Sequence, residues 1–169
     1  MKKVLLAASV VAFAHTAQAA TLNLYCSAQE DWCQLMSKTF EEKTGINVKM
    51  QRKSSGETFA QIRAESSNPK GDVWWGGTGD PHLQAAEEKL TAPYVSPMRS
   101  ELQDWAISQA KSAGDRTIGI YSGALGYGYN TDLLKKNNLP APTCWKDLLK
   151  PEFKGHVQIA NPNSSGTAY

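Results

Sequence analysis

Residues 46–62, INVKMQRKSSGETFAQI, contain the two kinds of segment from which the fold is built. Residues 46–51 alternate apolar and polar side chains, which is typical of a strand with one buried face. From Glu57 onward the apolar residues return at helical spacing, and Ser54-Ser55-Gly56 lies between the two segments as a turn. Ser54 and Glu57 have the spacing of a capping box, so the pattern predicts a strand that passes directly into a capped helix.

The same order recurs on both sides of this stretch. Residues 21–26 alternate like a strand, and residues 30–45 place apolar side chains on one helical face before a glycine ends the helix. Residues 71–77, GDVWWGG, indicate a short buried strand, and residues 80–90 a helix with proline in its first turn. Strands and helices that alternate at this spacing predict an α/β fold with a mostly parallel sheet covered on both faces.

The second half of the sequence is less regular. Residues 100–111 predict another helix, and residues 116–134 form an extended stretch rich in Tyr, Ile and Gly. Its glycines do not fit the Gly-x-Gly-x-x-Gly phosphate fingerprint, which favours close backbone packing or a crossover. Residues 139–162 predict a loop, a short helix and a new strand. The final NPNSSGTAY predicts a helix start at Ser164 or Ser165, from which we infer that the sequence is a fragment.

Residues 1–19 predict a signal peptide. A lysine pair precedes an apolar stretch, Val4–Ala14, that is too short to span a bilayer, and Ala17-Gln18-Ala19 has the small-x-small pattern of a cleavage site. The alternative, a membrane anchor, is disfavoured by that length. We therefore expect a mature protein that begins near Ala20 and is exported.

The charge balance excludes one class of partner. The whole sequence has 18 basic and 16 acidic residues, and the two lysines of the signal peptide account for the excess. Binding to nucleic acid or anionic lipid needs clustered Lys and Arg, which a formally neutral mature chain does not show. We expect no nucleic-acid partner, and any preference for an anion must be local.

Three cysteines allow two interpretations. The spacing of Cys26 and Cys33 suits a local disulfide between a strand end and the following helix, which would leave Cys144 unpaired. The alternative is that all three are small buried residues. Scattered histidines and a Cys-x6-Cys spacing do not supply the four ligands of a structural zinc site.

Four turns lead from a predicted strand to a predicted helix: residues 27–30, 54–57, 76–80 and 163–167. Ligands of parallel α/β proteins collect at such turns, where helix N-termini present free N–H groups. Ser27 and Glu30 have the spacing of a second capping box, and ordinary capping is the alternative role for each turn. Paired serines followed by glycine favour an anion such as phosphate, phosphonate, carbonate or carboxylate, because hydroxyls and exposed amides all donate.

Three stretches of the sequence resemble the periplasmic solute-binding proteins of ABC importers, in the ferric-iron-binding group. They are FEEKTGINV (40–48), RAESSNPKGDVWW (63–75) and the order DLLKPEFKG…PNSSGT (147–155 and 162–167). The resemblance implies a type II periplasmic binding protein fold with two α/β lobes. It divides the chain into a signal peptide (1–19), a first lobe (20–118), a crossover region (119–130) and the start of a second lobe (131–169) that is incomplete here.

The resemblance also implies where the ligand binds. It places the first three turns on the cleft face of the first lobe, and the fourth at a helix start that in many relatives receives an anion bound beside a metal. The expected ligand-binding residues are Ser27, Gln29, Ser54, Ser55, Gly56, Thr78, Asp80, Ser164, Ser165, Gly166 and Thr167.

Ferric iron with a synergistic anion is the first expectation for the transported ligand. Relatives hold iron with neighbouring tyrosines beyond the residues of this chain, and with a His or Tyr after the first strand. Here Gln29 and Glu30 stand after that strand, which leaves Glu30 and Asp80 as candidate metal ligands. The alternative ligand is a phosphorylated sugar or organophosphonate, which suits a site of serines and amides.

The expected activity is capture and delivery of a solute to an inner-membrane permease by a monomer, without a cofactor and without enzymatic chemistry. Lobe closure around the ligand is the working step. A remote alternative is an exported hydrolase with Ser164 or Ser165 as nucleophile, although the usual hydrolase motifs are lacking.

Overall fold

The computed structural model describes residues 20–168, and its centre is a parallel sheet of three strands. The strands are β1 (Thr21–Cys26), β2 (Asn47–Arg52) and β3 (Val73–Trp75), in the order β2-β1-β3. β1 pairs with β2 along its whole length, whereas β3 pairs only with Leu24–Cys26. The predicted parallel α/β arrangement is confirmed.

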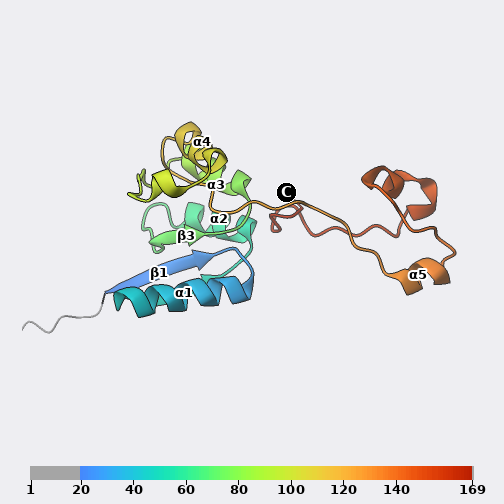
Figure 1. Ribbon diagram of the computed structural model, residues 1–169, viewed down its shortest axis with the longest axis horizontal. Helices are drawn as coiled ribbons and strands as arrows, with labels where there is room; N and C mark the ends of the chain where they lie inside the picture. Colours follow the sequence, from blue (N-terminus) through green and yellow to red (C-terminus); the bar gives the residue numbers. More distant parts are fainter. Residues whose placement is uncertain (1–19, 169) are drawn as a thin grey trace, which may run out of the picture.

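Helices connect and cover the strands. Figure 1 shows α1 on one side of the strands and α2, α3 and α4 on the other. The helices are α1 (Glu30–Thr44), α2 (Ser55–Ala64), α3 (Gly79–Glu87), α4 (Asp104–Ser112) and α5 (Thr131–Lys136), with 3-10 turns η1 (Arg99–Glu101), η2 (Trp145–Leu149) and η3 (Pro151–Phe153). No helix within residues 20–168 is long and apolar enough to cross a membrane, and the predicted signal peptide lies outside the described residues.

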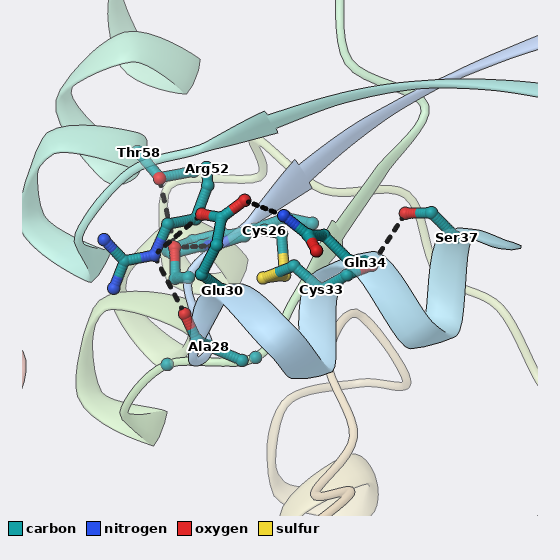
Figure 2. Close-up of a disulfide and its surroundings, with 12 residues drawn as sticks. Cys26, Ala28, Glu30, Cys33, Gln34, Ser37, Arg52 and Thr58 are labelled. Atoms are coloured by element: carbon teal, nitrogen blue, oxygen red, sulfur yellow. Dashed lines mark hydrogen bonds and ion pairs between the residues drawn. A yellow bond between two sulfur atoms is a disulfide. The ribbon is translucent and has the colours of Figure 1, made fainter.

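The core is small and gathers around the end of β1. Leu24, Cys26 and Cys33 are buried there with Ala28, and side chains of β2 and β3 pack against them. A disulfide joins Cys26 to Cys33, with an S–S distance of 2.03 Å (Figure 2). It fastens the first turns of α1 to the last residue of β1, while Cys144 is free and exposed.

Capping boxes were predicted at the N-termini of α1 and α2, and only the one at α2 is formed. The capping box at the start of α2 is confirmed, because Glu57 Oε2 accepts hydrogen bonds from Ser54 N (3.1 Å) and Ser54 Oγ (2.6 Å). The capping box of Ser27 and Glu30 is wrong: Gln29 is the N-cap residue of α1, and no side chain caps this end. Ser27 lies two residues before the N-cap position, and its hydroxyl has other partners.

The chain beyond α4 leaves the sheet and returns to it. Residues 119–130 form no helix or strand, and α5, η2 and η3 lie away from the sheet (Figure 1). The strand predicted before residue 162 is not formed, since no neighbouring strand pairs with it among residues 20–168 and Ile159 is 78% exposed. Likewise, residues 163–168 form no helix, because Ser164 N and Ser165 N both donate to Asn161 O and close a single turn. The lobe boundaries at residues 118 and 130 stay a prediction.

Candidate ligand-binding site

Three turns that follow the strands lie at one edge of the sheet. Cys26 pairs with Arg52 of β2 and with Trp75 of β3, so the three parallel strands end together. The backbone continues this pairing by one step, since Ser27 N donates to Trp75 O at 2.9 Å and Lys53 N to Cys26 O at 3.0 Å. The N-termini of α1, α2 and α3 therefore meet at the carboxyl edge of the sheet, where the N–H groups of helix ends favour an anion.

Ser27 belongs to a hydroxyl network and not to a helix cap. Its Oγ accepts a hydrogen bond from Trp74 Nε1 at 2.9 Å and lies 3.0 Å from Thr58 Oγ1. Thr58 is only 1% exposed, so this partner of Ser27 is buried. These two partners hold the Ser27 side chain over α2 and away from the start of α1.

The two serines of the first Ser-Ser-Gly turn have different roles. Ser54 is engaged with Glu57, and hydrogen bonds from its side chain and then its backbone lower the pKa of the Glu57 carboxyl. Ser55 is buried, with 3% of its surface exposed, and its Oγ accepts a hydrogen bond from Thr78 N at 3.2 Å. The Ser55 hydroxyl proton is therefore free for a further acceptor.

Thr78 carries a buried hydroxyl with no hydrogen-bond partner among the described residues. It is the N-cap residue of α3, beside the N-terminus of α2. The preceding Gly77 has φ +94°, and a Cβ there would lie 2.3 Å from Ser55 Oγ and 2.9 Å from Ser27 Cβ. A side chain at residue 77 would displace both serines, so glycine keeps the three hydroxyl residues close together.

The two Ser-Ser-Gly turns are in contact, although 110 positions separate them in sequence. Gly56 N donates a hydrogen bond to Ser164 O at 3.1 Å. Gly166, like Gly77, lies against the Ser55 hydroxyl: a Cβ built on Gly166 would be 2.7 Å from Ser55 Oγ and 2.6 Å from Thr78 Oγ1. Ser165 is half-buried beside them, and Thr167 is exposed.

The remaining candidates from the sequence lie outside this cluster. Gln29 is exposed, and its backbone carbonyl accepts from Cys33 N. Glu30 accepts from Gln34 Nε2 at 3.0 Å and lies 3.8 Å from Arg52 Nε (Figure 2), while Asp80 is exposed in the first turn of α3. Within residues 20–168 no three His, Cys, Asp or Glu side chains gather closely enough to hold a metal ion, so Glu30 and Asp80 stay hypothetical ligands.

Sequence patterns missed two residues that shape the site from outside the turns, His82 and Tyr121. His82 stacks on Trp74 with ring centroids 3.6 Å apart, and its Nε2 lies 2.8 Å from Gly76 O. A carbonyl oxygen only accepts, so Nε2 is the donor, and burial lowers the pKa of the imidazole. Tyr121 Oη accepts from Gly77 N at 2.7 Å. His82 lies in the first turn of α3, so the predicted helix could have placed it near the turn. No local pattern links residue 121 to residue 77.

Aromatic side chains border the glycine turn. The ring of Tyr121 meets that of Trp32 edge-on, with centroids 5.6 Å apart, and lies 6.3 Å from that of Trp75. A groove of about 930 Å³ is lined by β3 together with Gly76 and Gly77. Neither Ser27 nor Ser55 lines this groove, so the hydroxyl cluster is a separate feature next to the same glycines.

A parallel α/β fold with a polar cluster at the N-termini of α2 and α3 has the arrangement expected of a protein that binds a ligand at the carboxyl edge of its sheet. Residues 78–169 match the bacterial extracellular solute-binding protein family, and the chain belongs to that family. The membership predicted from the sequence is confirmed. Members of this family are periplasmic or extracellular, and those of ABC importers work with an inner-membrane permease.

Three relatives show how far the likeness extends. An "Uncharacterized protein" of Haemophilus influenzae is 46% identical over 149 residues, which are 88% of this chain and 43% of that protein. A "Putative 2-aminoethylphosphonate-binding periplasmic protein" of Salmonella typhimurium is 31% identical over 140 residues, or 81% of this chain and 37% of that one.

The third relative is a solved structure. The periplasmic binding protein AfuA from Actinobacillus pleuropneumoniae, with exogenous fructose-6-phosphate bound, has a TM-score of 0.81 and 43% identity. The likeness covers 88% of this chain and 47% of AfuA. The type II periplasmic binding protein fold is thereby confirmed, and the chain spans less than half the length of each of these relatives.

Proposed function

We propose that the protein captures a phosphorylated organic solute in the periplasm and delivers it to an inner-membrane ABC permease. The observation that carries this proposal is the buried Thr78 hydroxyl, which has no hydrogen-bond partner within residues 20–168, beside the buried Ser55 hydroxyl at the N-termini of two helices. A buried polar group without a hydrogen bond costs about 1–3 kcal/mol, which a ligand oxygen would recover.

The chemistry of the cluster suits a phosphoryl group. Ser55 and Thr78 each have a hydroxyl proton to donate, and the first N–H groups of α2 and α3 point toward the same edge of the sheet. Hydrogen bonds to a charged acceptor contribute roughly 1.5–3 kcal/mol each. Because the mature chain is formally neutral overall, local donors of this kind would provide the selectivity for an anion.

The relatives support a phosphorylated solute better than they support iron. Ferric iron with a synergistic anion was the first expectation from the sequence. The AfuA structure holds fructose-6-phosphate, and the printed name of the Salmonella relative refers to 2-aminoethylphosphonate. Both solutes combine a phosphorus oxyanion with an organic part, which is the class that the alternative expectation named.

In this proposal the protein makes and breaks no covalent bond. A ligand that binds both lobes shifts the population toward the closed form, and the permease recognises that form. We propose that the protein acts as a monomer, without a cofactor, after export by a signal peptide.

Thermal unfolding of the full-length protein with a panel of solutes tests the proposal. Fructose-6-phosphate or 2-aminoethylphosphonate should raise the unfolding temperature, because a ligand at 100 times its Kd adds about 2.7 kcal/mol to the free energy of unfolding. Fructose, which lacks the phosphoryl group, should not. Stabilisation by ferric citrate alone, with a visible phenolate-to-iron colour, would replace this proposal with iron binding. Steady turnover of a model ester would revive the hydrolase.

A further inference from the structure

The first and second Ser-Ser-Gly turns meet backbone to backbone. Gly56, the second residue of α2, donates from its amide to Ser164 O at 3.1 Å. A Cβ built on Gly56 would lie 2.3 Å from Asn163 O and 3.0 Å from Ser164 Cα. Both are backbone atoms, so no rotation of a side chain could make room for it. The approach of residues 163–164 therefore requires glycine at residue 56.

Gly166 contacts side-chain atoms of the same cluster, and these atoms can move more easily than a backbone. Its built Cβ would be 2.6 Å from Thr78 Oγ1, 2.7 Å from Ser55 Oγ and 2.9 Å from Thr78 Cγ2. These are side-chain atoms, and the hydroxyl of Ser55 can turn away. Alanine at residue 166 would thus disturb the contact less than alanine at residue 56.

The backbone conformation at residues 56 and 166 does not require glycine. Gly56 and Gly166 do not belong to the glycines with positive φ among residues 20–168. Gly56 lies inside a helix, where alanine is more favourable than glycine. The local preference at residue 56 therefore opposes the residue that stands there, and the close approach of the second turn is what accounts for it.

We propose that Gly56 and Gly166 are positioning residues for closure of the protein around its ligand. They let residues 163–166 rest directly on the N-termini of α2 and α3, so that the two turns enclose the phosphoryl group. The Gly56 amide serves the contact with Ser164, and the hydroxyls of Ser55 and Thr78 remain for the ligand. This inference rests on the proposed function and adds to it the residues that permit closure.

The test compares Gly56→Ala and Gly166→Ala with Gly126→Ala in the full-length protein. Gly126 is an exposed glycine with nothing within 4 Å of a built Cβ, which makes it a matched control. Three quantities are measured for each variant: the Kd for fructose-6-phosphate by calorimetry, the unfolding temperature without ligand, and the change in radius of gyration on adding ligand by X-ray scattering.

We expect Gly56→Ala to bind about tenfold or more weakly, as an overpacked contact predicts, and to lose the ligand-induced decrease in radius. Its unfolding temperature without ligand should change little, because the gain of the helix from alanine offsets the loss of the contact with residues 163–164. Gly166→Ala should show a smaller loss of affinity and Gly126→Ala none.

If wild type binds and Gly56→Ala matches its affinity and compaction, the closure role is refuted. If Gly56→Ala loses its fold, an unchanged affinity of Gly166→Ala refutes it instead. Failure of wild type to bind would refute the proposed function itself.

Discussion

The hydroxyl of Ser55 accepts a hydrogen bond from the backbone amide of Thr78, across 3.2 Å and 23 positions of sequence. This one bond joins the N-terminus of α2 to that of α3 and places two hydroxyls side by side. Ser55 is buried, with 3% of its surface exposed. Ser55 is the first residue of α2 and not its N-cap residue, which is Ser54, so its hydroxyl is engaged with α3 and not with its own helix.

Substitution of Ser55 by alanine should weaken the binding of fructose-6-phosphate by about tenfold, the value of one hydrogen bond to a charged group. The unfolding free energy should fall by only about 1 kcal/mol, because the Thr78 amide loses its acceptor. Calorimetric titration and chemical denaturation measure the two effects. Ser108→Ala, at an exposed helical serine, is the control. A loss of stability without any loss of affinity would return Ser55 to a purely structural role.

Replacement of Thr78 by valine separates binding from stability more sharply. Its hydroxyl is buried without a partner in the described residues, so removing it should leave the unfolding free energy unchanged or raise it slightly. Valine keeps the shape of the side chain, and only the donor is lost. Binding of fructose-6-phosphate should nevertheless become about tenfold weaker. Equal affinity of the Thr78→Val variant and wild type would show that this hydroxyl does not contact the ligand.

Substitution of Ser165 by alanine tests the second turn. Ser165 is half-buried next to Gly166, which packs on Ser55 and Thr78. We expect weaker binding of fructose-6-phosphate, measured by the same titration, with an unchanged unfolding temperature. The exposed neighbour Thr167 offers a control, since Thr167→Ala should have the smaller effect. An effect of Ser165→Ala on the unfolding temperature alone would contradict a role in binding.

The disulfide between Cys26 and Cys33 should contribute about 2 kcal/mol to stability, as expected for a short closed loop. It ties the start of α1 to the buried end of β1, beside Ser27. Cys26→Ser with Cys33→Ser should lower the free energy of unfolding by that amount in oxidising buffer, and added reductant should then have no further effect. Cys144→Ser, at the exposed free cysteine, serves as control. Equal stability of the double variant and wild type would show that the bond contributes nothing.

His82 should make stability depend on pH near neutrality. Burial lowers the pKa of its imidazole below the ordinary 6.5, while in the unfolded chain the ordinary value returns. Below that value the unfolded state binds a proton that the folded state does not, so the free energy of unfolding should fall as the pH falls from about 7 to about 5. Denaturation of wild type and His82→Gln at several pH values measures this. The same slope in both proteins would assign it to other groups.

Local patterns were sufficient for the first half of the fold. Alternation marked β1 and β2, Gly45 ended α1 with φ +70°, and the box at Ser54 started α2. These features depend on residues that are close in sequence. The strand predicted near Ile159 is not formed, because a strand depends on a pairing partner that can lie far away in sequence.

The site was predictable only in part for a similar reason. The turns at Ser55 and Thr78 could be found because helix N-termini follow strands at fixed spacing. The contacts of Thr58 with Ser27 and of Tyr121 with Gly77 join residues that are 31 and 44 positions apart. No local pattern carries that information, and the contact of the two Ser-Ser-Gly turns through Gly56 and Ser164 has the same character.

The most direct test of the central claim is a calorimetric comparison of fructose-6-phosphate with fructose on the full-length wild-type protein. The two solutes share the sugar and differ in the phosphoryl group, which we assign to the donors at Ser55 and Thr78. The account predicts tight binding of fructose-6-phosphate, with fructose weaker by about a hundredfold or more, as two or more charged hydrogen bonds imply. Equal affinity for the two solutes, or binding of ferric citrate with no response to fructose-6-phosphate, would contradict it.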